Sequence, residues 1–156
     1  MKKITTALFI SFIGSLSVFT ACADDRDIAA PNEKVLATFR NQYPDTDFVE
    51  WEKEGSFFVA EFRIEGIEAE AWYDKNGQWI STEVEIAAAN LPEKVKTAFA
   101  HTGYAGWKIE DCDQIIRPQD TLYLIEVENT KDKEIDLLFD KYGKLLEEKR
   151  NIRMPL

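Results

Sequence analysis

The fold is decided by residues 57–73, which read FFVAEFRI, then EG, then IEAEAWY. Side chains alternate in character on both sides of Glu65-Gly66, and this period-two pattern predicts two β-strands, Phe57–Ile64 and Ile67–Tyr73. A Glu-Gly pair between two such runs fits a tight turn, because glycine adopts the positive φ angles that tight turns need. The stretch therefore predicts an antiparallel β-hairpin.

The same reasoning extends the hairpin in both directions. A strand is predicted at Phe48–Glu54 before it and another at Gln78–Ile86 after it. Apolar residues at helical spacing come first in the chain, at Val35, Leu36 and Phe39, and Asn32 is the predicted N-cap. We predict one amphipathic helix followed by a four-stranded antiparallel meander.

Two short motifs in this region occur a second time. Glu33-Lys34-Val35 recurs as Glu93-Lys94-Val95, and Tyr73-Asp74-Lys75-Asn76-Gly77 recurs as Phe139-Asp140-Lys141-Tyr142-Gly143. Internal similarity of this kind indicates a repeated structural unit. The second helix carries the apolar stripe Leu91, Val95, Ala98 and Phe99 and is predicted to stop at Gly103. The second set of strands is predicted at Trp107–Cys112, Thr121–Asn129, Glu134–Asp140 and Lys144–Lys149, with the extra residues of this copy in a loop at Asp113–Asp120.

These patterns predict an α+β fold of two tandem helix-plus-four-stranded antiparallel sheet repeats. We divide the chain into a lipoprotein signal peptide at 1–21, an acidic linker at 22–30, repeat 1 at 31–88 and repeat 2 at 89–152. Alternation also assigns the helix-facing core. In repeat 1 it comprises Phe58, Ala60, Phe62, Ile64, Ile67, Ala69, Ala71 and Tyr73, and in repeat 2 Tyr123, Ile125, Val127, Ile135, Leu137 and Phe139.

The opposite sheet face mixes apolar and acidic side chains, whereas a solvated face is usually polar. The apolar members are Phe57, Val59, Trp72, Trp79, Leu122, Leu124 and Leu138, and the acids beside them include Glu61, Glu70 and Glu126. Exposed apolar groups rimmed by charge favour protein recognition, so we predict that these ten residues bind a protein or peptide. The alternative is that the apolar members pack against a linker, the other repeat or the loop before Pro118.

The first residues have the composition of an export signal. Lys2 and Lys3 precede an uncharged apolar run, which is too short for a permanent membrane span and ends in small residues. Phe19-Thr20-Ala21-Cys22 is similar to a lipobox, and an acidic cluster follows it. We predict lipid attachment at Cys22 and an outer-membrane or cell-surface lipoprotein. The alternative is cleavage at Ala23 and a periplasmic or secreted protein.

The net charge and the few reactive side chains exclude several classes of function. The formal net charge is −10, and phosphate binding needs a basic surface, so nucleic acid is an improbable partner. With one histidine, His101, and one cysteine besides the predicted lipid-attachment residue, Cys112, the sequence predicts no metal site, no cofactor and no catalytic residue. We expect a monomer that contacts the membrane only through its lipid. An enzyme is the third hypothesis, after a binder of a protein or peptide and a binder of small ligands or cations.

The sequence also resembles a known family. Phe48-Val49-Glu50-Trp51-Glu52-Lys53-Glu54-Gly55, Ala71-Trp72-Tyr73-Asp74-Lys75-Asn76-Gly77-Gln78-Trp79 and Ile125-Glu126-Val127 resemble the PepSY-like, β-lactamase-inhibitor-like proteins of Bacteroides-type bacteria. The resemblance implies a fold similar to the β-lactamase inhibitor protein, in which the sheet presents a concave face to an enzyme. It implies no site residue, because no inhibitory motif is matched. We expect an exported, lipid-anchored, non-enzymatic binding protein that recognises a protein or peptide, and the alternative is an envelope binder of small ligands or cations that uses the acidic strand residues.

Overall fold

The structure, a computed structural model, describes residues 27–28 and 30–155. The predicted signal peptide, its lipid-attachment residue Cys22 and most of the predicted linker lie outside the described residues. The elements, in chain order, are β1 (Asp27–Ile28), α1 (Glu33–Gln42), β2 (Val49–Glu54), β3 (Phe57–Ile64), β4 (Ile67–Tyr73), β5 (Trp79–Glu85), the 3-10 turn η1 (Ala88–Asn90), α2 (Glu93–Ala100), β6 (Lys108–Ile116), β7 (Thr121–Glu128), β8 (Glu134–Asp140) and β9 (Leu145–Lys149).

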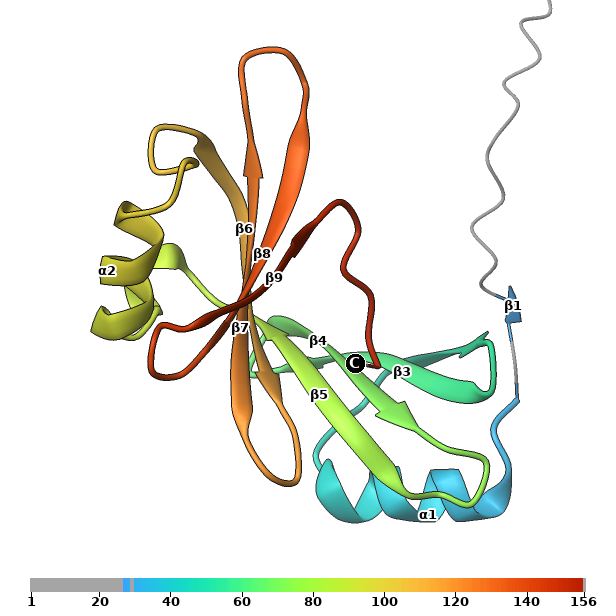
Figure 1. Cartoon of the computed structure of the whole chain (residues 1–156). Coiled ribbons are helices and arrows are strands. Elements are labelled where there is room, and N and C mark those ends of the chain that lie inside the picture. Colours follow the sequence, from blue (N-terminus) through green and yellow to red (C-terminus); the bar gives the residue numbers. More distant parts are fainter. Residues whose placement is uncertain (1–26, 29, 156) are drawn as a thin grey trace, which may run out of the picture.

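In the described part of the chain, all nine strands form one antiparallel sheet in which strand order equals chain order. The predicted α+β class is therefore correct. The sheet is continuous, instead of being divided between two repeats, because β5 pairs with β6 from Thr82 opposite Ile116 to Glu85 opposite Asp113. This short ladder joins an N-terminal half of the sheet, β1–β5, to a C-terminal half, β6–β9 (Figure 1).

Helix α1 begins at the predicted cap. Oδ1 of Asn32 accepts hydrogen bonds from the backbone N–H groups of Lys34, at 3.0 Å, and Val35, at 3.2 Å, which satisfies donors that the first helical turn leaves open. Val35 and Phe39 then pack on the sheet. The predicted core of this half is confirmed for Phe58, Ala60, Phe62, Ile64, Ala69, Ala71 and Tyr73, whereas Ile67 is exposed.

Helix α2 covers the C-terminal half in the same way. Leu91 and Val95 pack against all six predicted residues, which are Tyr123, Ile125, Val127, Ile135, Leu137 and Phe139. The helix ends at Ala100, before the predicted stop at Gly103. The exposed His101 caps it, because its backbone N–H donates to carbonyl oxygens of the last turn, and its Nδ1 lies 2.7 Å from the carbonyl oxygen of Thr97.

The two motifs that occur twice in the sequence meet in space. Gly77 and Gly143 close the Asp-x-x-Gly turns with φ angles of +83° and +86°. A Cβ on Gly77 would lie 2.8 Å from the carbonyl carbon of Lys34, and one on Gly143 would overlap the carbonyl oxygen of Lys94. Each turn therefore rests on the first turn of the helix that covers its half, and only glycine allows that approach.

Strand β6 corrects the prediction for Asp113–Asp120. The segment was predicted to be a loop, but β6 continues through it to Ile116, because Ile115 is fully buried and the last four residues of β6 pair with both β5 and β7. The extra residues of the second half therefore lengthen the strand that links the two halves, and only the short turn from Arg117 to Asp120 remains.

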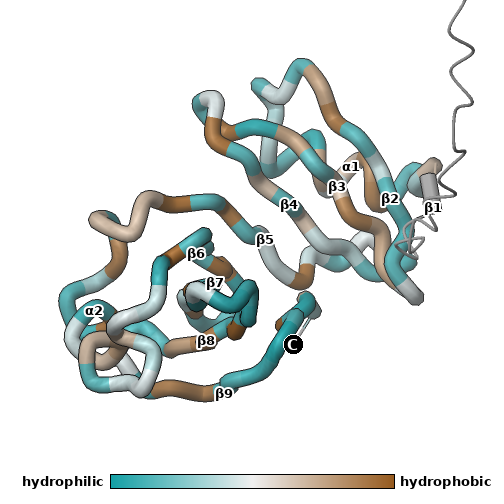
Figure 2. The backbone as a smooth tube through the Cα atoms, turned by 90° about the horizontal axis from the view of Figure 1, so that it is seen from above, coloured by the Kyte–Doolittle hydropathy of each residue, from teal (hydrophilic) through white to brown (hydrophobic). Residues whose placement is uncertain are grey.

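The two halves turn their helix-free faces toward each other, while α1 and α2 lie on the outer faces (Figures 1 and 2). After β9, Asn151 adopts a φ of +53° and the chain turns back between the halves. We call residues 151–155 the strap. No helix within the described ranges is both long enough and apolar enough to cross a membrane.

Candidate functional site

The predicted apolar recognition surface is buried. Exposed fractions are 2% for Val59, Trp72 and Leu122, 8% for Leu124 and 3% for Leu138, and Phe57 is half-buried against them. The prediction that these residues are exposed is wrong. They form a third core between the two halves, together with Ile80, Ile115 and two strap residues, Ile152 and Met154. We call this set the concave core. The alternative considered above, packing against the other half, describes these residues correctly.

Trp79 lies on the other face of the sheet. A register shift between Trp72 and Tyr73 places Tyr73 opposite Trp79 and Trp72 opposite Ser81. A shift of one residue moves a side chain to the opposite face, so Trp79 joins the core beneath α1, where its Nε1 donates to Oγ1 of Thr82 at 2.9 Å. Its predicted place on the recognition surface is wrong for this reason.

The acidic residues remain at the surface and are aligned by the register. Glu50 lies opposite Glu61, Glu61 opposite Glu70, and Glu70 opposite Glu83, so four adjacent strands each place a glutamate in one line across the sheet. Neighbouring strands are about 4.8 Å apart, which brings the four carboxylates into one row. Like charges at directly opposed positions usually lower the stability of a sheet.

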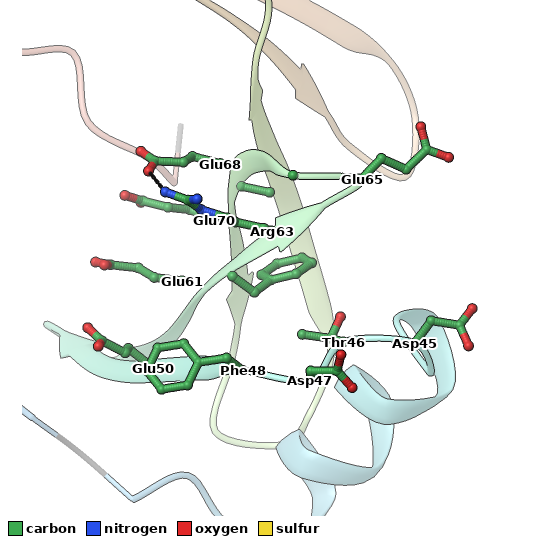
Figure 3. Close-up of a pocket in the computed structure, with 13 residues that line it drawn as sticks. Asp45, Thr46, Asp47, Phe48, Glu50, Glu61, Arg63, Glu65, Glu68 and Glu70 are labelled. Carbon is green, nitrogen blue, oxygen red and sulfur yellow. Dashed lines mark hydrogen bonds and ion pairs between the residues drawn. The ribbon is translucent and has the colours of Figure 1, made fainter.

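This row borders a groove of about 600 Å³ at the turn end of the β3–β4 hairpin. In Figure 3, Glu50, Glu61, Glu68 and Glu70 project to the same side, and the ring of Phe48 lies beside Glu50. Phe48 is 71% exposed, which is unusual for a phenylalanine. Arg63 donates to Glu68 at 2.6 Å on the rim of the groove, so the groove combines one exposed ring with a mainly acidic lining.

A second acidic row follows on the C-terminal half. Asp111 lies opposite Glu126, and Glu126 lies opposite Asp136. Between the two rows, Asp113 and Glu85 face each other across the β5–β6 ladder, and a smaller cavity of about 210 Å³ is lined by acids from both halves. We call the eight of these acids that are at least partly exposed the acidic band: Glu50, Glu61, Glu70, Glu83, Glu85, Asp111, Asp113 and Glu126. Asp136 is left out because it is 6% exposed and its Oδ2 accepts from the backbone N–H of Ile152 in the strap.

Burial and mutual repulsion raise pKa values within the acidic band. Burial raises the pKa of Asp113 to about 7, and the charges of Asp111, Glu85, Glu70 and Glu126 add to the effect. Burial also raises the pKa of Glu126 above its ordinary value, with repulsion from Asp136 contributing. The band therefore holds its negative charge at an energetic cost, and a cation bound there would lower that cost.

Other chemistry is limited in the described part of the chain. No group of three or more His, Cys, Asp or Glu residues in that part is arranged to hold a metal ion. Cys112 is 1% exposed, and burial raises the pKa of its thiol to about 12, so it is a small buried residue and the thiolate needed for nucleophilic chemistry is disfavoured.

Of the predicted binding residues, Glu61, Glu70 and Glu126 are the ones that the structure brings together at the surface. Their role in binding stays a prediction. Sequence reasoning placed Glu83 on the same face as Glu61 and Glu70. It missed Glu50, Glu85, Asp111 and Asp113 as members of one band, because their alignment depends on strand register. It also missed the strap, although Ile152-Arg153-Met154 carries the same period-two signal as a strand.

Comparison of the chain with protein-family models agrees with the fold described above. The family model described as "Putative beta-lactamase-inhibitor-like, PepSY-like" matches residues 56–147, which is more than half of the chain. None of the curated proteins that were compared with the chain matches it.

Solved structures from Bacteroides are also similar to this chain. A BLIP-like protein of Bacteroides fragilis is 33% identical, with a TM-score of 0.69, and the match covers 78% of this chain and 86% of that one. A DUF2874 family protein of Bacteroides uniformis is 25% identical over 78% of this chain and 89% of that one, with a TM-score of 0.74. A protein of Bacteroides eggerthii described as "putative periplasmic" has the same coverage and TM-score at 18% identity. The chain thus belongs to the PepSY-like, β-lactamase-inhibitor-like family that its sequence resembles.

Proposed function

We propose that this protein is a non-enzymatic binding protein that recognises a basic segment of a protein or peptide through the acidic band. The observation that carries the proposal is the line of four glutamates on β2–β5, continued by Asp111 and Glu126 on β6 and β7. A run of Lys or Arg side chains laid across the strands would meet one carboxylate about every 4.8 Å. Electrostatic complementarity of this kind raises the association rate and selects the partner's charge.

Phe48 adds an apolar contact at one end of the band. Its exposed ring lies beside Glu50 at the mouth of the groove (Figure 3). An aromatic side chain beside carboxylates can stack on an arginine or cover the stem of a lysine. This arrangement favours a polypeptide partner over a single inorganic ion, since it offers both a ring and a series of charges.

Membership of the family supports an inhibitor-like role in which the partner is itself an enzyme.

We also propose that the protein is exported, carries a lipid on Cys22 and lies at the outer membrane or cell surface. The composition of a lipoprotein signal supports this, with Lys2 and Lys3 followed by an apolar run that leads to Phe19-Thr20-Ala21-Cys22. Mass spectrometry of the mature amino terminus tests this part. An acyl mass on Cys22 is expected, whereas an unmodified chain that begins after Ala21 or at Ala23 would contradict it.

The two halves, 31–88 and 89–152, are proposed to be copies of one unit. In both halves a helix precedes four strands, and in both an Asp-x-x-Gly turn rests on a lysine of the first helical turn, Gly77 on Lys34 and Gly143 on Lys94. A superposition of the two halves that failed to align these contacts would contradict the proposal.

Binding to a labelled peptide of alternating lysine and glycine tests the acidic band. We expect the Glu61→Gln, Glu70→Gln double variant to bind at least tenfold more weakly at low ionic strength, and we expect added salt to weaken wild-type binding, because surface charges are screened. The matched control is Glu33→Gln, Glu93→Gln, which removes the same charge from the first turns of the two helices. Equal loss in both double variants would refute a specific role for the band.

One observation favours the second candidate function, a binder of small cationic ligands. Asp113, Asp111, Glu85 and Glu70 come from three strands around the cavity of about 210 Å³, and the pKa of Asp113 is raised to about 7. Calorimetry with calcium and with small polyamines tests it. A heat of binding that disappears in Asp113→Asn would support this function. If neither ligand gave a heat of binding, this second function would be refuted and peptide binding would be the one candidate left.

A further inference from the structure

The strap lies in the concave core like a bound peptide. Ile152 and Met154, two residues apart, insert their side chains beside Trp72, Leu124 and Leu138, and their exposed fractions are 7% and 5%. Arg153, between them, is exposed, and its guanidinium Nη1 lies 3.8 Å from Oε1 of Glu54. Side chains that alternate in this way are typical of an extended segment bound to a sheet face.

The strap makes polar contacts through Ile152 and Arg153. The backbone N–H of Ile152 donates to Oδ2 of Asp136 at 2.6 Å, and Arg153 lies near Glu54 as described above. The strap is not a strand and pairs with none of the described strands. The burial of its two apolar side chains adds to these contacts and helps to offset the entropy of ordering five residues.

The strap also leaves two buried polar groups without partners. Nε1 of Trp72 and Oγ of Ser81 have no hydrogen-bond partner among the described residues, although Trp72 is 2% and Ser81 0% exposed. These residues are directly opposed on β4 and β5, and Trp72 lines the concave core. Buried donors without acceptors are costly, so an occupant that offered an acceptor to them would fit this groove better than the strap.

We infer that the concave core is a peptide-binding groove that the strap occupies in cis, and that a partner's extended segment with two aliphatic side chains flanking a cationic residue displaces the strap. The partner's backbone carbonyl or side-chain amide would accept from Trp72 Nε1, which the strap does not satisfy. This inference goes beyond the proposed function, because the groove recognises aliphatic side chains, whereas the neighbouring acidic band recognises basic ones.

Fluorescence polarisation with a labelled peptide, Arg-Asn-Ile-Arg-Met-Pro-Leu, tests the inference in the full chain. The Ile152→Asp, Met154→Asp double variant, which releases the strap, is expected to bind this peptide at least tenfold more tightly than wild type. The matched control is Ile67→Asp, Leu146→Asp, which places the same two charges on exposed aliphatic residues outside the strap and is expected to stay within threefold of wild type. No binding by a released, folded variant, or equal binding by wild type, would overturn the inference.

A second measurement on the wild type keeps the test valid if the double variant unfolds. Hydrogen exchange of the Ile152 amide reports opening of the strap, and exchange of the Ile125 amide reports opening of the core. We expect Ile152 to exchange at least a hundredfold faster. Equal rates would show that the strap leaves only when the protein unfolds, which also overturns the inference.

The lysine-glycine peptide, which has no side chain like those of Ile152 and Met154, reports binding to the acidic band separately. Failure of one proposal is therefore distinguishable from failure of the other.

Discussion

Replacing Asp113 with asparagine is expected to stabilise the protein at alkaline pH. The side chain lies at the β5–β6 ladder, where burial and the charges of Asp111, Glu85, Glu70 and Glu126 raise its pKa to about 7. Asparagine has nearly the same shape and no charge, so it removes the repulsion while keeping the packing. The variant therefore isolates the cost of holding one carboxylate at the junction of the two halves.

The magnitude follows from the pKa difference between the folded and unfolded chains. The pKa is 3.8 without the fold and about 7 within it, and at about 1.4 kcal/mol per unit the cost of ionising Asp113 has an upper bound of about 4 kcal/mol. Asp113 keeps some contact with water, so we expect about 1–3 kcal/mol. Because the folded-state pKa is raised, the stabilising effect of the protonated form is complete below about pH 4 and is lost as the pH rises through about 7.

Urea unfolding at a series of pH values, followed by tryptophan fluorescence, measures this effect. Asp113→Asn should be more stable than wild type at pH 8.5, and the gain should fade toward pH 4. The exposed Asp45→Asn variant is the control and should stay within about 0.5 kcal/mol of wild type. A gain that is the same at every pH, or a loss at pH 8.5, would refute the electrostatic reasoning.

Two further predictions concern packing. Gly143→Ala should destabilise the protein by more than about 2 kcal/mol in urea unfolding, because its Cβ would overlap the carbonyl of Lys94 at a positive φ, whereas Gly103→Ala, which meets nothing within 4 Å, should change stability by less than about 0.5 kcal/mol. Cys112 should resist a thiol reagent until the protein unfolds, because its side chain is buried and burial raises the thiol pKa to about 12; rapid labelling of the folded chain would contradict this.

The sequence predicts the local elements well where one face of a strand meets a helix. Strands β3 and β4 have the predicted bounds, because their alternation is set by burial beneath α1 and their turn is the two-residue Glu65-Gly66. The same turn fixes the register, so the opposition of Glu61 and Glu70, which are equally distant from it, also follows from the sequence. That part of the acidic band could be predicted from the sequence alone.

What covers the opposite face of the sheet could not be predicted from the sequence. Alternation shows that Trp72 and Leu124 share a face, but it does not show what covers that face. The cover depends on the β5–β6 ladder, which turns the two halves toward each other, and on Ile152 and Met154, which follow the last predicted strand. Both are long-range features, and the alternation of a strand does not show which distant segment will cover it.

The order of strands in the sheet has a consequence for how the protein is made. Each of the nine described strands pairs only with its neighbours in the chain, so each new hairpin can add to a surface that already exists. A chain that crosses a membrane pore unfolded, amino terminus first, could therefore grow its sheet in the order in which residues emerge. The strap would find its place only after both halves had formed, which makes its docking the closing step of assembly.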